Sequence, residues 1–324
     1  MHHNYHFLQK VSTSLLPLLK EKTLLTCFSQ NKDEVIFGFS NAQHQETYIR
    51  ATLTLEFSCL NITEEFHRAK RNSINLFPQI LDEKVVDVIQ SENERSFQVK
   101  LTNDFTLLFK LFGNRSNVIL FKDAQVVDIF NHNFEMDYDL LLTQQNRIIS
   151  QNWEDFQEVN GDLKKIYPTF GKVVLHYLNA HNYGNLSLEV KWGVIQELLE
   201  GFENQQEYYV TKYQGKVILS MLEVGDVIYT CKEPIEALNT FYRYFSSTYY
   251  LDKEKDQLRN VLTKKINKST KYVQSNTKNL EKLKNGVSLK QIADVLMANL
   301  YTIEKGVEQV ELFNFYTEST ISIK

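Results

Sequence analysis

One short segment carries the side chains best suited to recognition chemistry, Ser91-Glu92-Asn93-Glu94-Arg95-Ser96. Arg95 offers a planar guanidinium that suits a phosphate or the face of an unpaired base, and Glu94 could fix its rotamer or accept from a base edge. The alternative is an exposed salt bridge at a turn, worth under about 1 kcal/mol. From the residues alone, the salt bridge is the favoured interpretation.

No spacing in the chain assembles a Ser/His/Asp triad or a pair of catalytic carboxylates, so we assign no catalytic residue and no cofactor. His2, His3 and His6 lie close together, but no further metal ligand accompanies them and we expect them to be exposed. The three cysteines are scattered without CxxC spacing, which indicates neither a disulfide framework nor a zinc site.

Charge is unevenly distributed along the 324 residues. The chain carries −4 overall, yet Lys253 to Lys290 holds 11 Lys/Arg against 3 Asp/Glu, so the remainder carries −12. Such segregation indicates one anionic partner surface, or else a solvated helix face. The lysines that would meet the partner are Lys264, Lys265, Lys268, Lys271, Lys278, Lys282 and Lys284.

The same segment has the spacing of a coiled-coil seam, alternating steps of four and three residues. The seam positions are Leu262, Ile266, Ser269, Val273, Asn276, Leu280 and Leu283. A helix from Leu251 to Leu283 would be about 50 Å long and should project as an arm. One helix cannot bury the seam, and we find no matching segment downstream. We therefore expect either a fragment of a longer protein or a partner helix from another molecule, such as a second copy.

The composition is that of a folded chain, and no stretch of about 18 apolar residues could cross a membrane. The opening residues are amphipathic and lack the apolar core of a signal peptide, so we expect a helix and a cytoplasmic protein. Alternating short runs then predict a β-sandwich or barrel of eight or nine antiparallel strands. The predicted strands are Thr23–Phe28, Glu34–Phe39, Tyr48–Leu55, Phe57–Ile62, Val85–Gln90, Ser96–Thr102, Thr106–Phe112, Asn117–Phe121 and Val126–Ile129.

Helices dominate elsewhere. A helical patch is predicted from Thr63 to Lys84, and Asp162 to Leu178 predicts a helix, a tight hairpin and a second helix, which could present backbone N–H groups to a phosphate. An ordinary helical hairpin remains the alternative. A further helix, Leu186–Phe202, precedes a β-hairpin across Gln214-Gly215, and Pro234 begins a helix whose aromatic stripe is typical of core.

Three motifs resemble the NFACT family, which includes RqcH-like proteins also labelled fibronectin-binding. Gly113-Asn114-Arg115-Ser116-Asn117 resembles its Gly-x-x-Ser-Asn motif, Asp294 to Tyr301 with Lys305-Gly306 resembles its coiled-coil tip, and Phe66 to Phe77 is similar as well. The resemblance implies an α+β multidomain protein. Its parts are a glycosylase-like amino-terminal β-sandwich domain (1–136), a helical middle domain with helix-hairpin-helix character (137–250), an outgoing coiled-coil helix (251–284) and a truncated tip (285–324).

The resemblance also implies a non-enzymatic RNA-binding protein that holds tRNA and the obstructed large ribosomal subunit. For bacterial members it further implies support for carboxy-terminal alanine tailing of stalled chains. The implied tRNA-binding residues are Arg68, Lys70, Arg71, Glu94, Arg95, Arg115 and Asn117, and the lysines above would meet rRNA. The family's Asp-Arg pair is Glu94-Arg95 here, and a frequent Glu-Ile-Met run is Lys110-Leu111-Phe112, which leaves open whether tailing proceeds in the same way.

Two other functions compete. The first is a DNA glycosylase. Glycosylases of this fold resemble one another in using an amino-terminal Pro followed by Glu as nucleophile and acid, whereas this chain has His2-His3 after Met1. The glycosylase hypothesis is therefore limited to an inactive nucleic-acid binder. The second is an extracellular protein that binds fibronectin or fibrinogen, against which the missing signal peptide counts.

Overall fold

The protein is an α+β chain with antiparallel sheets and one long helix. The computed structural model describes residues 2–54 and 57–324, apart from the side chain of residue 285. The chain divides into two compact units, Met1–Thr248 and Tyr249–Lys324. Within the described ranges, no helix is both long enough and apolar enough to traverse a membrane.

The first unit begins with α1 (Tyr5–Leu19), which is capped by the Asn4 side chain accepting from the His6 amide at 2.9 Å. One face of α1 is buried, as its predicted amphipathic pattern requires, although Leu18 is 41% exposed. Full burial of a Leu or Phe side chain stabilises a fold by about 1.5–3 kcal/mol. The buried residues of α1 are Phe7, Leu8, Val11, Ser12, Leu15 and Leu19.

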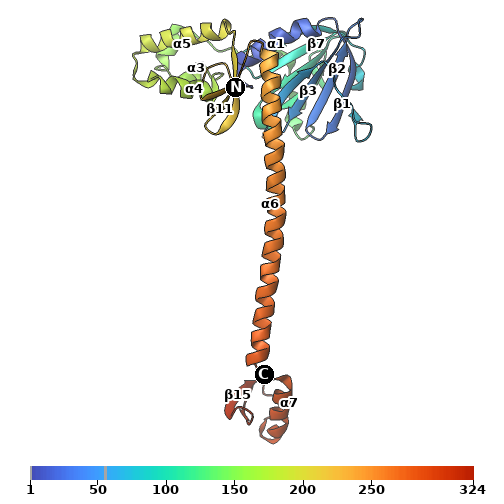
Figure 1. Ribbon diagram of the computed structural model, residues 1–324, viewed down its shortest axis with the longest axis vertical. Helices are drawn as coiled ribbons and strands as arrows, with labels where there is room; N and C mark the ends of the chain where they lie inside the picture. The colour runs from blue at the N-terminus through green and yellow to red at the C-terminus, as the bar shows by residue number, and fades with distance from the viewer. Residues whose placement is uncertain (1, 55–56) are drawn as a thin grey trace. The chain divides into compact units, whose positions relative to one another are not determined.

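Two five-stranded antiparallel sheets follow, and Figure 1 shows β1, β2 and β3 side by side in one of them. The first sheet has the order β4-β3-β2-β1-β5. Its strands are β1 (Thr23–Asn31), β2 (Glu34–Ser40), β3 (Glu46–Leu53), β4 (Ser58–Thr63) and β5 (Ile74–Asn75). The second sheet has the order β10-β9-β8-β7-β6. Its strands are β6 (Val85–Gln90), β7 (Ser96–Leu101), β8 (Phe105–Lys110), β9 (Asn117–Lys122) and β10 (Gln125–Ile129).

The two sheets share one apolar core. The ring of Phe37 on β2 meets that of Phe109 on β8 with centroids 5.4 Å apart, and Phe97 stacks on Phe109 at 4.8 Å. Every residue of β2 is buried, as expected for a central strand. The predicted antiparallel strands are therefore confirmed; the predicted end of the third at Leu55 lies outside the described residues.

The predicted helix from Thr63 to Lys84 is wrong. Thr63 ends β4, and the rest of this stretch holds only the two-residue strand β5 and the short 3-10 helix η1 (Pro78–Ile80). Asn72, Phe77 and Asp82 have φ angles of 61°, 45° and 69°, and a residue in this left-handed region interrupts a right-handed helix. Pairing of Ile74 and Asn75 with β1 stabilises the extended form instead.

The remainder of the first unit is mainly helical. After β10 come η3 (Glu135–Asp139), η4 (Leu142–Gln144), α2 (Trp153–Glu158), α3 (Leu163–Ile166), α4 (Gly171–Ala180), η5 (Tyr183–Asn185) and α5 (Leu188–Glu203). The short helix η2 (Gly113–Arg115) lies earlier, between β8 and β9. The predicted hairpin is present as β11 (Tyr208–Tyr213) and β12 (Lys216–Ser220), and β13 (Asp226–Cys231), which the sequence did not predict, pairs with the other side of β11.

Helix α6 (Pro234–Asn285) is one unbroken 52-residue helix, drawn in orange in Figure 1. Its first turns bury Phe241 and Tyr242, so this part of the aromatic stripe is core, as predicted. All side chains from Leu251 to Lys284 are exposed. The second unit also contains α7 (Leu289–Ala298), η6 (Leu300–Thr302), and a hairpin of β14 (Val310–Asn314) with β15 (Ser319–Ile323). Ile321 to Ile323 lie in β15 and pair with β14.

Candidate nucleic-acid interface

The turn that connects β6 and β7 presents Glu94 and Arg95. The Ser91 amide donates to the Ser96 carbonyl at 3.0 Å, and the Gln90 side chain donates to the Glu94 carbonyl at 2.8 Å. Asn93 takes a φ of 51°, which an asparagine tolerates well. Arg95 is exposed and Glu94 is half-buried, so both side chains are held at the surface by a well-bonded turn.

A distant segment fixes this turn from outside. The Arg147 amide donates to the Glu92 carbonyl at 2.9 Å, and the Asn93 side chain donates to the Arg147 carbonyl at 3.0 Å. The Glu92 amide donates to the Asn146 side chain at 2.9 Å. These bonds bring the exposed Arg147 guanidinium beside Glu94 and Arg95, a neighbour that nothing in the sequence indicated.

The predicted helical hairpin forms the other wall. α3 and α4 are joined by a tight turn that Asn4 holds, because its side chain donates to the carbonyls of both Thr169 and Phe170 at 2.9 Å. Gly171 takes a φ of 70°, which favours glycine. Among the described residues, no side chain caps the first turn of α4, and the first amides of any helix lack partners within the helix. This helix start is therefore able to bind an anion.

These elements enclose a cavity of about 430 Å³. Of the described residues that line it, Arg95, Arg147 and Lys172 are cationic and Glu94 alone carries a carboxylate. The other lining residues are His2, His3, Asn4, Asn93, Pro168, Thr169, Phe170, Gly171 and Val173. A positive surface beside an uncapped helix start suits the phosphate backbone of a nucleic acid.

Electrostatics at the cavity follow from partial burial. Burial raises the pKa of Glu94, and the positive charges of Arg147 and Arg95 act in the opposite direction. Burial also lowers the pKa of His3 to about 4, although its ring contact with the Ser58 carbonyl opposes this shift. His3 is therefore neutral at pH 7, and the cavity carries more positive than negative charge.

The expectation that His2, His3 and His6 are exposed is wrong, because all three are partly buried. The His2 ring lies 4.6 Å from that of Phe241, and the His6 ring lies 5.0 Å from that of Phe202. The rings of His2 and His6 thus pack on aromatic side chains, whereas the His3 ring contacts the Ser58 carbonyl and the His2 ring, and the spacing of the three histidines indicated none of these contacts. In the described parts of the chain, no three His, Cys, Asp or Glu side chains gather as metal ligands would.

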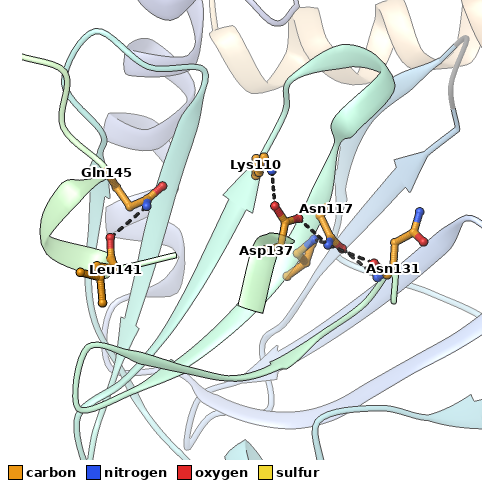
Figure 2. Close-up of polar contacts among 7 residues, drawn as sticks. Lys110, Asn117, Asn131, Asp137, Leu141 and Gln145 are labelled. Carbon is orange, nitrogen blue, oxygen red and sulfur yellow. Dashed lines mark hydrogen bonds and ion pairs between the residues drawn. The ribbon is translucent and has the colours of Figure 1, made fainter. Parts of the chain in front are cut away.

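Asn117 lies beneath the surface. It is 0% exposed, its side chain donates to Asp137 at 2.9 Å, and its oxygen accepts from the amides of Val118 and Asn131. Figure 2 shows Asp137 between Asn117 and Lys110, with which Asp137 forms a buried ion pair. Asn117 thus holds the segment that follows β10 and offers no free polar group to a ligand. Arg115, two residues earlier, is exposed.

The remaining predicted residues do not line this cavity. Arg68 is fixed by Ser73 and Asn75 at 2.6 and 2.7 Å and lies 4.4 Å from the Phe28 ring. Lys70 and Arg71 are exposed in the same loop. The seven lysines predicted to meet rRNA are all exposed on α6, as are the apolar seam residues, of which Leu262, Ile266 and Val273 are 56%, 62% and 61% exposed.

The fold has solved counterparts. The fibrinogen binding protein from Staphylococcus aureus matches 75% of this chain and 99% of its own, with a TM-score of 0.56 and 13% sequence identity. The amino-terminal part of the fibronectin/fibrinogen-binding protein from Streptococcus suis matches 74% of this chain and 98% of its own, with a TM-score of 0.55 and 14% identity. At these identities the likeness establishes the fold alone.

A search of curated proteins finds no matching sequence. The family model of NFACT N-terminal and middle domains matches residues 163–324, which include α3, α4, the whole of α6 and the second unit. Half of the chain is thereby covered, in the region where the coiled-coil tip motif was recognised. The chain belongs to the NFACT family.

Proposed function

We propose that this protein is a non-enzymatic RNA-binding factor of ribosome quality control. It binds tRNA and the obstructed large ribosomal subunit in the cytoplasm, and it supports carboxy-terminal alanine tailing of stalled chains. The observation that carries the proposal is the cavity in which Arg95, Arg147 and Lys172 meet the uncapped start of α4. Membership of the NFACT family supports it as well.

In this proposal, residues 1–136 and 137–250 together form the tRNA-binding part. A phosphate lies at the start of α4, where the backbone amides and the charge of Lys172 stabilise it. Arg95 and Arg147 bind neighbouring phosphates or stack on an unpaired base, and Glu94 accepts from a base edge. Arg115 and the loop with Arg68, Lys70 and Arg71 are exposed enough to extend the contact.

Residues 251–284 act as the rRNA-binding arm and 285–324 as its tip. The exposed lysines of α6 neutralise phosphates, and the counterions they release make affinity depend on salt. The exposed seam pairs with a second helix of matching spacing, such as that of a second copy.

The test is tRNA binding measured by fluorescence anisotropy. We expect the triple variant Arg95→Ala, Arg147→Ala, Lys172→Ala to bind at least about 10-fold more weakly, since removing a cation that neutralises a phosphate reduces both affinity and salt dependence. A matched control replaces three exposed lysines outside the cavity, Lys20→Ala, Lys32→Ala and Lys216→Ala, with the same change in net charge. Equal losses of affinity in both triple variants would show that net charge, and not the cavity, determines tRNA binding.

A second candidate function is binding of fibronectin or fibrinogen, which the names of the two structural counterparts suggest. Binding of this chain to immobilised fibronectin and fibrinogen, compared with immobilised albumin, tests it. Specific capture that the cavity triple leaves unchanged, together with no tRNA binding by the unmodified protein, would favour this second function.

A further inference from the structure

Phe112 lies just after β8, and its ring meets two cationic groups. The guanidinium carbon of Arg95 is 5.6 Å from the ring centroid, and the ammonium nitrogen of Lys110 is 5.5 Å from it. Phe112 is half-buried and does not line the cavity, whereas Arg95 does. Through its contact with Arg95, this ring can therefore influence a ligand bound in the cavity.

Hydrogen bonds fix the backbone on both sides of Phe112. The preceding residue, Leu111, is 1% exposed, and its amide donates to the Arg95 carbonyl at 2.9 Å. On the other side, the Ser116 side chain donates to the Gly113 carbonyl at 2.9 Å and closes the turn. The backbone on both sides of Phe112 is thus tied down, directly beside the residue it contacts.

Lys110 is fixed as well, because its ammonium group pairs with Asp137, which also accepts from Asn117 at 2.9 Å (Figure 2). The carboxylate neutralises Lys110, so this lysine is not available for a ligand. Of the two cations on the Phe112 ring, only Arg95 is exposed. The Phe112 ring, held by a fixed backbone, therefore restrains the exposed guanidinium of Arg95.

We propose that Phe112 is a positioning residue for Arg95. An exposed arginine loses rotamer entropy when a ligand immobilises it, and a side chain already packed on an aromatic face has less to lose. Phe112 thereby prepares Arg95 to receive an RNA phosphate or base. This inference rests on the proposed function of the same cavity.

The experiment compares Phe112→Leu, which keeps an apolar side chain without a π face, with Phe112→Tyr, which keeps the face. We expect Phe112→Leu to weaken tRNA binding by about 2- to 5-fold, the range of an exposed cation–π contact, and Phe112→Tyr to bind as the unmodified protein does. In the Arg95→Ala background, Phe112→Leu should have no further effect. An equal loss of affinity in that background would overturn the positioning role, because the ring would then act independently of Arg95.

A second readout does not need RNA. The NMR signal of the Arg95 side-chain N–H proton can be assigned because it disappears in Arg95→Lys. The aromatic ring should shift this signal upfield in the unmodified protein. The shift should persist in Phe112→Tyr and be lost in Phe112→Leu. If the unmodified protein shows the shift but binds no RNA, the proposed function is contradicted, although the contact between Phe112 and Arg95 is confirmed. An unshifted proton in the unmodified protein would overturn the positioning inference, whatever the affinity.

Discussion

Lys110 and Asp137 form an ion pair whose side chains are only 11% and 5% exposed. Removing one member of a buried pair leaves an uncompensated charge, which costs about 3–5 kcal/mol. We expect Asp137→Asn to lower the free energy of unfolding by about 3 kcal/mol, measured by urea denaturation. The double variant Lys110→Met, Asp137→Asn should recover most of that stability, because it leaves no buried charge and keeps an acceptor for the Asn117 side chain. A double variant as unstable as Asp137→Asn would contradict the charge argument.

Gly38 is required by close packing inside the first sheet. A Cβ atom there would lie 2.7 Å from the Thr26 hydroxyl and 2.7 Å from the Tyr48 ring. Gly38→Ala should therefore destabilise the protein by about 1–3 kcal/mol, as overpacking does. Gly193→Ala is the control, since α5 leaves open space there and alanine favours a helix by about 1 kcal/mol over glycine. Thermal unfolding of both variants should show opposite shifts.

Stability should fall in mild acid because of His3. Burial lowers its pKa to about 4, whereas an unfolded histidine titrates near a pKa of about 6.5. Between these two values the unfolded chain takes up a proton that the folded chain refuses, so stability is highest above about pH 6.5 and decreases toward about pH 4. His3→Gln should reduce the difference in unfolding midpoint between about pH 7.5 and about pH 5. An unchanged difference would show that His3 does not carry this dependence.

Binding to large ribosomal subunits should weaken steeply as salt increases. Replacing Lys264, Lys268, Lys271 and Lys278 by Gln keeps helix propensity similar. It should reduce the slope of log affinity against log salt by about 0.7–0.9 for each phosphate that the variant no longer neutralises. Co-sedimentation over a series of salt concentrations measures the slope, and helix content by circular dichroism is the control. Binding that is the same at low and high salt would exclude the lysines as a phosphate-binding surface.

Local patterns predicted much of this fold. The short, largely apolar runs predicted for β2 and β9 identified strands whose bounds agree closely with the structure, because a strand buried on both faces is apolar along most of its length. The hairpin at Gln214-Gly215 was found from its turn residues. The segment around Arg68 and Arg71 misled the helix prediction, since its short-range pattern permits a helix but its pairing partner, β1, lies far away in sequence.

The sequence predicted only part of the candidate site. Glu94 and Arg95 stood out by residue type and by resemblance, and the turn at Gly171 by its hairpin layout. Their meeting, and the arrival of Arg147 and Lys172 beside them, depends on hydrogen bonds between segments that are distant in sequence. The burial of Asn117 likewise depends on Asp137, which no motif marked.

By itself, the sequence determined most strands of the two sheets, which long helix carries the lysines, and where its apolar seam runs, because these properties follow from the chemical nature of near neighbours. Tertiary structure alone decided which charges converge on one cavity, which asparagine is buried, and which aromatic ring supports Arg95. Those outcomes require chain segments to approach across many residues, and the free energy of that approach comes from the shared core of the two sheets, not from any local pattern.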